Sequence, residues 1–365
     1  MMKILLATPY GIHAGGIARW AEHITRYYDA TGKKDCDMVL FPMGRKYEDL
    51  HSSKFGRIKN GIRDYLIYIK RLKKEMRDKE YDLVHIASSA SLGLIKDVFM
   101  INVAHKNSAK VVIHFRFGRI PELSEKRNWE WKLLSYVIKK ADKVIVLDKA
   151  SYETLIKEGY KNVCLLPNPV APRVTDIVGK TGVQERKSRS LLFAGHGLRT
   201  KGIFELVEAC KQISDIRLKM IGTIQESVKA ELYAKSNNAE WLEVCGEQSF
   251  ENVIKEMLTC DVFVLPTYTE GFPNVILESM ACGCAIVTTP VGAIPEMLEE
   301  EDGKQYGVLV PPQNTIELKE SIERMLNDEA LKLECRKNVQ LRVNERYNID
   351  AVWRQMVSIW NETLK

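Results

Sequence analysis

Long hydrophobic runs are absent from this 365-residue sequence. No apolar stretch approaches the roughly 20 residues that a helix needs to cross a bilayer. The opening segment, MMKILLATPYG, contains an apolar run only as long as a strand, so we expect no cleavable signal either. With 45% hydrophobic and 28% charged residues, the composition excludes disordered, collagen-like and coiled-coil proteins. The length predicts two domains.

Cysteine patterns typical of metal binding are also absent. The eight cysteines follow no CxxC spacing and none has an adjacent histidine, which argues against zinc. Most of them lie among apolar residues, where a free thiol packs as a small hydrophobe. We therefore expect a reducing, cytoplasmic compartment.

Charge is distributed unevenly along the chain, whose net charge is +6. Residues 1–170 carry 31 Lys and Arg against 19 Asp and Glu, a balance of +12, whereas the balance of residues 171–365 is −6. Within the basic half, the stretch from Lys54 to Lys79 predicts a cationic amphipathic helix with an apolar series at Ile62, Leu66, Ile69, Leu72 and Met76. That helix either lies on an anionic membrane surface or covers a sheet with a solvated charged face.

Two further features of the basic half bear on its partners. Trp129 and Trp131 are either an interfacial anchor or core residues. The aromatic-rich platforms that accompany nucleic-acid binding are not visible, so we expect no nucleic-acid partner.

Strand and helix patterns alternate in both halves, which predicts an α/β fold of two Rossmann-like, doubly wound parallel sheets. The expected strands are Lys3–Thr8, Cys36–Phe41, Leu83–Ile86, Val111–Phe115, Lys143–Leu147, Asn162–Leu166, Ser190–Ala194, Arg217–Ile221, Trp241–Val244, Val262–Leu265, Ala285–Thr288 and Gly307–Val310. We place the domains at residues 1–170 and 171–345, with a linker from Asp176 to Arg189 and a final helix in residues 346–365. Open parallel sheets bind ligands at the carboxyl ends of their strands, so the crevice between the domains is the expected site.

The most informative segment is LPTYTEGFPNVILESMACGCAIVTTPVGAIPE, from Leu265 to Glu296. A helix is expected to begin near Pro273, with Glu278 on it and Glu270 in the loop before it. Sugar hydroxyls could donate hydrogen bonds to both carboxylates; otherwise Glu278 pairs with a core cation and Glu270 lies at the surface. The start of this helix suits a phosphate or sugar oxygen, through Gly271, Phe272, Pro273 and Asn274.

Three other segments could bind ligands. SLLFAGHGLRTKG runs from a strand into a helix and carries Arg199 and Lys201, two cations that would bind a diphosphate or remain solvated. The Gly15-Gly16 pair follows the first strand but does not match the dinucleotide-binding pattern G-x-G-x-x-G. His114 is expected at the carboxyl end of a strand, as a substrate-binding or acid–base group or as a structural histidine.

The combined pattern resembles glycosyltransferase family 4 over nearly the whole chain. Glu270 and Glu278 stand in the E-x7-E arrangement of retaining glycosyltransferases with the GT-B fold. The resemblance implies that Glu278 holds the ribose of a nucleotide sugar and that Glu270 holds hydroxyls of its sugar. It also implies donor contacts from Gly271 to Asn274, a leaving diphosphate neutralised by Lys201, and a final helix that crosses back to the first domain.

The first domain contributes less specific features to this resemblance. Gly16 would supply a backbone amide, and His114 matches the family's histidine near the donor sugar. One position departs from the family pattern, because His196 stands where Arg usually follows the strand glycine, and Arg199 could supply that charge. No DxD-type acidic motif is placed to hold a metal, so we expect no metal and no other cofactor.

The resemblance implies a retaining hexosyltransferase of bacterial surface-polysaccharide synthesis (capsule, O-antigen or exopolysaccharide) that uses a nucleoside-diphosphate sugar, with UDP favoured over GDP. The +12 charge of the first domain favours a saccharide acceptor on a polyprenyl diphosphate at the inner face of the cell membrane. Two alternatives stay open at this point: a nucleotide-sugar epimerase of the same architecture, and a non-catalytic binding or scaffold protein.

Overall fold

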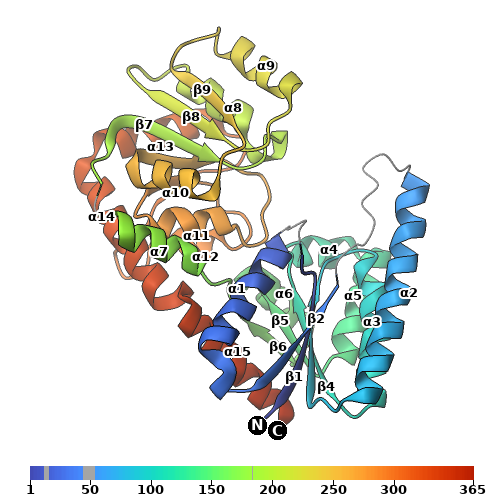
Figure 1. Ribbon diagram of the computed structural model, residues 1–365. Coiled ribbons are helices and arrows are strands. Elements are labelled where there is room, and N and C mark those ends of the chain that lie inside the picture. The colour runs from blue at the N-terminus through green and yellow to red at the C-terminus, as the bar shows by residue number, and fades with distance from the viewer. Residues whose placement is uncertain (12–15, 44–53, 183) are drawn as a thin grey trace. The chain divides into compact units, whose positions relative to one another are not determined.

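The computed structural model describes residues 1–11, 16–43, 54–182 and 184–365, with the backbone alone for residues 54–63. The described chain divides into two compact units (Figure 1). The first comprises residues 1–168 and 352–365, and the second comprises residues 169–351. Each unit is built around one six-stranded sheet in which every pairing is parallel.

The sheet of the first unit has the strand order β2-β1-β3-β4-β5-β6. Its strands are β1 Lys3–Thr8, β2 Asp37–Pro42, β3 Leu83–Ser88, β4 Lys110–Phe115, β5 Lys143–Val146 and β6 Val163–Leu165. The helices are α1 Gly16–Ala30, α2 Lys54–Asp78, α3 Gly93–Lys106, α4 Ile120–Lys126, α5 Trp129–Lys140 and α6 Lys149–Lys157, joined by most of α15 Ile349–Leu364.

The second unit has the strand order β12-β11-β10-β7-β8-β9. Its strands are β7 Lys187–Ala194, β8 Arg217–Ile221, β9 Leu242–Gly246, β10 Cys260–Leu265, β11 Ala285–Thr288 and β12 Val308–Leu309. Its helices are α7 Pro172–Thr181, α8 Ile203–Cys210, α9 Glu226–Lys235, α10 Phe250–Thr259, α11 Asn274–Ala281, α12 Ile294–Leu298, α13 Thr315–Asn327 and α14 Glu329–Arg342.

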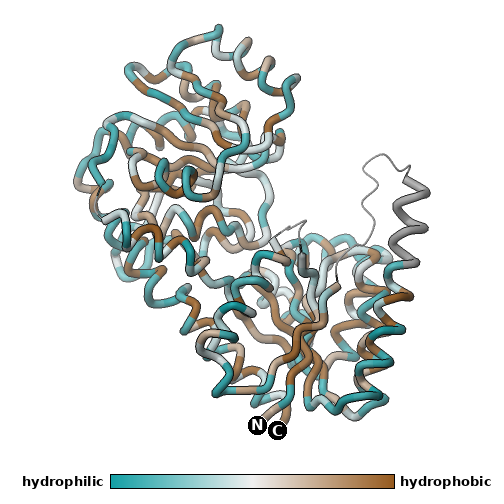
Figure 2. Tube along the Cα trace, viewed as in Figure 1, coloured by the Kyte–Doolittle hydropathy of each residue, from teal (hydrophilic) through white to brown (hydrophobic). Residues whose placement is uncertain are grey.

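Alternating side chains of the first sheet face two different layers. Leu5, Val84 and Ile113 belong to the core beneath α2, α3 and α5. Residues one position away point to the opposite face, where His85 and His114 meet rings of α1 and α15. Figure 2 shows the apolar strands of this sheet between helices that are more polar outside. Both faces are covered, as parallel sheets require.

The structure contains a strand at each of the twelve places where the sequence predicts one, with ends that differ by up to three residues. The predicted linker is wrong in both of its outer parts. Residues 176–181 belong to α7, which begins with Pro172, buries Val174 and packs on the core of the second unit. Residues 187–189 belong to β7. The polar composition of this stretch reflects one solvent-facing helix surface and an exposed strand start.

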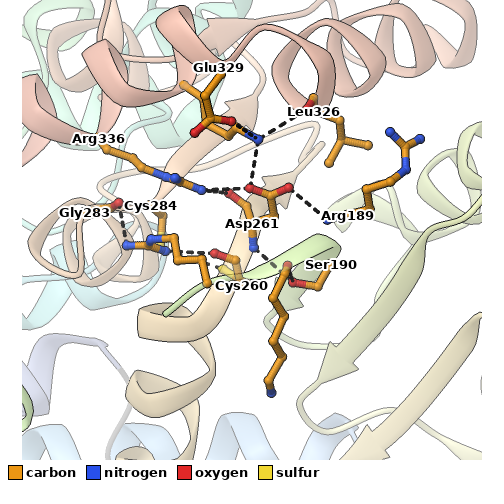
Figure 3. A network of polar contacts seen from close by, with 12 residues as sticks. Arg189, Ser190, Cys260, Asp261, Gly283, Cys284, Leu326, Glu329 and Arg336 are labelled. Atoms are coloured by element: carbon orange, nitrogen blue, oxygen red, sulfur yellow. Dashed lines mark hydrogen bonds and ion pairs between the residues drawn. The ribbon is translucent and has the colours of Figure 1, made fainter. Parts of the chain in front are cut away.

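A buried ion cluster stabilises the amino end of the second sheet (Figure 3). Asp261 at the start of β10 accepts hydrogen bonds from Arg336 Nη2 at 2.8 Å and from the Arg189 backbone N–H at 2.9 Å, and it pairs with Lys332 Nζ at 3.1 Å. The side chains of Asp261 and Lys332 are each 6% exposed. Because α14 supplies both cations, the cluster joins that helix to β7 and β10.

The predicted cationic helix forms as α2, with a different buried stripe. Tyr68, Leu72 and Met76 are buried, whereas Leu66 is exposed, because the helix turns the 68–72–76 row toward the sheet. Lys70, Lys73 and Lys74 are exposed. Among the described residues, no helix combines the length and apolarity needed to cross a membrane.

Candidate functional site

The order of the second sheet reverses between β7 and β10, which lie side by side at its centre. In open parallel sheets, ligands bind outside the carboxyl ends of the strands at such a reversal. The loop after β7 carries Lys201 in a short 3₁₀ turn, and the loop after β10 carries Glu270. Lys201 Nζ donates to Glu270 Oε1 at 2.5 Å. The fold therefore brings two predicted site residues together.

Backbone contacts hold the loops after β7, β10 and β11 against one another. The Tyr268 N–H donates to the Thr200 carbonyl at 2.8 Å, and the Ala293 N–H donates to the Gly271 carbonyl at 2.9 Å. Gly202 adopts φ +69°, and a Cβ there would lie 2.0 Å from the Pro266 carbonyl oxygen. Gly292 adopts φ +57°, and a Cβ there would lie 2.5 Å from the Glu270 carbonyl oxygen. Only glycine fits such close approaches in this conformation.

The predicted helix after Glu270 is α11, and Pro273 occupies its N-cap position. Proline provides no side-chain cap, and none is found on this helix. Its first N–H groups are thus oriented toward the loop that carries Gly271 and Phe272, both half-buried. Glu278 lies half-buried one turn along α11. Asn274 at the first position of α11 is half-buried as well.

Lys201 and Arg199 point to different carboxylates. Arg199 Nη2 lies 3.3 Å from Glu231 Oε1, and its guanidinium stacks over the Phe204 ring at 4.4 Å. Each of the two cations thus has its own acidic partner in the second unit. His196 is exposed in the same loop.

The first unit contains the remaining predicted residues. Gly16 begins α1, and a Cβ on it would meet open space. Gly15 lies outside the described residues. His114 is the penultimate residue of β4 and is fully buried. It lies next to Arg116, whose Nη1 is 3.1 Å from His114 Nε2, and edge-on to Trp20.

Burial changes the proton affinities in this part of the first unit. Desolvation, with further contributions from Arg116 and His85, lowers the pKa of His114 well below 6.5. Desolvation and the Arg116 charge lower the pKa of His85 to about 3. Burial also lowers the pKa of Arg116 to about 9. Both histidines are therefore neutral near pH 7.

The surroundings of His114 include residues that the sequence pattern did not single out. His85 reaches it from β3, Trp20 from α1, and Asn168 accepts from Arg116 Nη2 at 2.6 Å. Trp360 of α15 donates to His85 Nδ1 at 2.9 Å. These contacts join segments far apart in sequence. The only sequence feature that points to them is that His85 and His114 are each the second-last residue of a predicted strand.

No cluster of three or more histidine, cysteine, aspartate or glutamate side chains suited to a metal ion occurs among the described residues. The eight cysteines are free thiols, and six of them are buried.

Comparison with known protein families matches both parts of the chain. Residues 14–174 match the sequence model described as Glycosyltransferase Family 4, and residues 179–342 match the model described as Glycosyl transferases group 1. An uncharacterised glycosyltransferase of Methanocaldococcus jannaschii is 26% identical over 345 residues, which is 91% of this chain and 90% of that protein.

Solved structures show the same fold. Sucrose-phosphate synthase from Thermosynechococcus elongatus superposes with a TM-score of 0.76 at 19% identity, covering 99% of each chain. HepE from Anabaena, in complex with UDP-glucose, superposes with a TM-score of 0.69 at 17% identity, covering 99% of this chain and all of the other.

Proposed function

Since this chain is a glycosyltransferase of family 4 with the GT-B fold, we propose that it transfers a hexose from a UDP-sugar to a saccharide acceptor with retention at the anomeric carbon. The observation that carries the proposal is the Lys201–Glu270 pair at the strand-order reversal of the second sheet. The choice of UDP is supported by the solved HepE structure, which holds UDP-glucose.

Lys201 and α11 serve the leaving group in this proposal. When the bond between the anomeric carbon and the diphosphate breaks, its electron pair stays on a phosphate oxygen. A preorganised ammonium and the N–H groups at a helix start stabilise that charge most as it develops. Lys201 and the segment from Gly271 to Asn274 fill these roles, and Arg199 adds positive charge at the edge. This arrangement needs no metal ion.

The carboxylates hold the donor in place. Glu270 accepts hydrogen bonds from sugar hydroxyls, and Glu278 accepts from the ribose. From the first unit, Gly16 contributes a backbone amide in this proposal, and His114 acts near the donor sugar. The acceptor hydroxyl attacks on the face from which the diphosphate departs, the new carbon–oxygen bond forms there, and the hydroxyl proton passes to the departing phosphate.

Nucleotide binding tests the donor class. Thermal unfolding is measured with UDP, GDP, ADP and NAD, each with and without EDTA, on wild type and Glu278→Ala. A ligand at 100 times its Kd adds about 2.7 kcal/mol to stability. We expect UDP to stabilise the wild type equally with and without EDTA, and Glu278→Ala to lose the effect. Stabilisation by NAD alone would overturn the proposal.

Turnover tests the reaction. Hydrolysis and transfer of UDP-sugars are followed by NMR, with and without saccharide acceptors, on wild type and Glu270→Ala. We expect loss of transfer in the variant and an α-configured product from an α-configured donor. Full turnover by Glu270→Ala contradicts the role of Glu270. Epimerisation of the donor without any acceptor would instead identify a nucleotide-sugar epimerase.

We further propose that the first unit binds an anionic membrane surface, at the cytoplasmic face where a polyprenyl-diphosphate-linked acceptor of surface-polysaccharide synthesis is presented. Support comes from an exposed apolar strip on α3 and α5, formed by Leu92, Ile95, Phe99, Trp129 and Tyr136. Ser91 Oγ donates to Glu130 Oε1 at 2.8 Å and Lys140 Nζ donates to Asn102 Oδ1 at 3.1 Å, so the two helices run side by side along this strip.

Exposed lysines accompany the strip. Lys132 and Lys139 lie on α5, and Lys70 and Lys73 lie on α2, which packs beside α3. Exposed aromatic side chains next to cations are typical of surfaces that enter the headgroup region of anionic bilayers.

Vesicle sedimentation tests this surface. Binding is measured to phosphatidylcholine vesicles with and without phosphatidylglycerol, for wild type, for Phe99→Ser/Trp129→Ser, and for Ile316→Ser. Ile316 is a matched control because it is 71% exposed on α13 of the acidic second unit. We expect binding only to the anionic vesicles, and loss of binding in the double variant alone. Equal binding to both vesicle types contradicts the proposal.

A further inference from the structure

Four ring or guanidinium groups form a continuous line of polar contacts inside the first unit. Trp360 Nε1 lies 2.9 Å from His85 Nδ1, and His85 Nε2 lies 3.3 Å from His114 Nδ1. His114 Nε2 then lies 3.1 Å from Arg116 Nη1. Trp360 and both histidines are 0% exposed. This line connects the last helix of the chain to the carboxyl end of β4.

The chemistry of the two ends limits where the protons can be. An indole N–H and a guanidinium only donate, and a neutral imidazole has one donor and one acceptor nitrogen. In one arrangement, His85 accepts from Trp360, carries its proton on Nε2 and donates to His114 Nδ1. The proton of His114 is then on Nε2, where it meets the Arg116 donor.

Two other arrangements of neutral rings contain as many hydrogen bonds. In the first, His85 accepts from Trp360 and His114 accepts from Arg116, so His85 Nε2–H and His114 Nδ1–H face each other between two fully buried rings. In the second, His114 accepts from Arg116 and donates to His85 Nε2, so both histidines carry their protons on Nδ1 and His85 meets the Trp360 donor. Each arrangement contains two hydrogen bonds and one contact between donors. Protonation of either ring turns its acceptor nitrogen into a donor and so creates a further contact between donors. Protonation is also opposed by the desolvation that lowers both pKa values.

The group that can move decides among the three arrangements. Both histidine rings are fully buried, so a contact between their two donors is not relieved. Trp360 is fixed, because it is fully buried and packs edge-on against both His85 and Trp353. Arg116 is half-buried, its guanidinium stacks over the Trp20 ring at 4.4 Å, and its Nη2 already donates to Asn168 Oδ1. A small rotation of the guanidinium over that ring is enough to separate Nη1 from His114 Nε2. A contact between donors is therefore relieved at Arg116 and not at Trp360.

We propose that Trp360 and His85 are positioning residues that hold His114 in the tautomer with its proton on Nε2. His114 then meets the substrate as a hydrogen-bond donor, beside the Arg116 guanidinium, and not as a general base. The ligand group that fits is an oxygen acceptor, such as a sugar hydroxyl or a phosphate oxygen. The consequence for turnover rests on the proposed glycosyl transfer, whereas the tautomer itself does not.

Histidine tautomers are measured directly by two-bond ¹H–¹⁵N spectra of protein labelled with ¹⁵N-histidine. We expect Nε2–H signals for both His85 and His114 in the wild type. Trp360→Phe removes the fixed donor, so both rings are expected to change to Nδ1–H. Trp353→Phe is the matched control, since Trp353 also lies on α15 and its indole donates to Asp35 Oδ2 at 2.7 Å. It should leave both tautomers as in the wild type.

An Nδ1–H signal for His114 in the wild type overturns the proposal, whether or not any variant folds. An Nε2–H signal for His114 in folded Trp360→Phe overturns it as well. For turnover we expect kcat/KM about ten-fold lower in Trp360→Phe, from one misdirected hydrogen bond, and unchanged in Trp353→Phe. If the wild type transfers no sugar, the spectra still decide on the tautomer, so the two proposals fail separately.

Discussion

Lys201 and Glu270 neutralise each other's charge at a place where a substrate could form hydrogen bonds or ion pairs with both side chains. Their side chains are 21% and 12% exposed, and the contact spans 69 residues of sequence. A pair of this kind can separate when sugar hydroxyls satisfy the carboxylate and a diphosphate satisfies the ammonium. The Lys201–Glu270 ion pair therefore forms in the absence of substrate, and both of its groups become available when substrate binds.

The first prediction concerns Lys201. Lys201→Met removes the cation that faces the developing phosphate charge, and loss of one such preorganised donor lowers kcat about 10²–10³-fold. Lys219→Met is the control. It removes a comparable ion pair, between Lys219 Nζ and Glu256 Oε1 at 2.8 Å, from another part of the same sheet. Initial rates with a UDP-sugar measure both. A change in kcat below two-fold in Lys201→Met would contradict the assigned role.

The second prediction concerns His85 and pH. Its pKa in the folded protein is about 3, below the 6.5 of the unfolded chain, so the unfolded state binds the proton first as pH falls. Its stabilising contribution is complete above pH 6.5 and is lost progressively toward pH 3, with about 2 kcal/mol lost at pH 5. Denaturant unfolding at several pH values should show a shallower pH dependence of stability in His85→Gln than in the wild type. An unchanged pH dependence in this variant would contradict the assignment.

At the scale of elements, the loops after β7, β10 and β11 pack together as one assembly. Gly202 and Gly292 let the backbone of one loop touch the next, and the shared hydrogen bonds leave Lys201 and Glu270 in contact. The site therefore depends on packing between loops as much as on the charged residues themselves.

The third prediction separates backbone strain from this packing. Gly202→Ala places a Cβ 2.0 Å from the Pro266 carbonyl and must displace the loop that carries Glu270. Gly303→Ala has the same kind of positive φ, +71°, but nothing lies within 4 Å of its Cβ. Both variants should lose stability through backbone strain of about 1 kcal/mol. Only Gly202→Ala should also lose UDP affinity, measured by calorimetry; equal affinities would show that the contact is unimportant.

The fourth prediction concerns the ion cluster at the opposite end of the second sheet. Asp261→Asn takes the carboxylate away from the buried Lys332 and the half-buried Arg336, which costs about 3–5 kcal/mol. The Tm should fall by about 6–12 °C for 3 kcal/mol in a unit of this size. Glu329→Gln is the control, since Glu329 contacts the same Lys332 at 3.0 Å but is 65% exposed. Equal Tm values for both variants would contradict the account.

At the scale of the whole molecule, the first unit is built from two segments that are separated in the sequence by the second unit. α15 follows the second unit in sequence, yet its residues from Val352 onward belong to the first. Five of its side chains are buried there, namely Val352, Trp353, Met356, Ile359 and Trp360. Burial of five such side chains contributes roughly 7–15 kcal/mol, which is as large as the net stability of a domain.

The fifth prediction follows from this arrangement. Deletion of residues 349–365 should leave the second unit folded and able to bind UDP, while the first unit becomes sensitive to protease. Deletion of residues 361–365 keeps Trp360 and should change neither property. Limited proteolysis with mass spectrometry, together with UDP calorimetry, measures both. A protease-resistant first unit in the longer deletion would show that α15 is dispensable.

Local patterns were sufficient to predict the fold class, because strand and helix periodicities depend on near neighbours in sequence. Segments such as Arg217–Ile221 and Ala285–Thr288 were predicted with their observed ends. The linker was wrong for the same reason: α7 has few apolar residues, and its helical state depends on packing against the second unit. The roles of the site residues stay predictions, although Lys201 and Glu270 were selected from sequence alone.

Strand–helix alternation, the glycines and the E-x7-E spacing are readable from the sequence, since each is a property of a short segment. The tertiary structure alone decided which polar groups face one another. Lys201 meets Glu270 across 69 residues, and Trp360 meets His85 across 275. Those distances in sequence carry no periodic signal. The pairings follow from the strand order, which places the ends of β7 and β10 together, and from α15, whose last turns cover the first sheet.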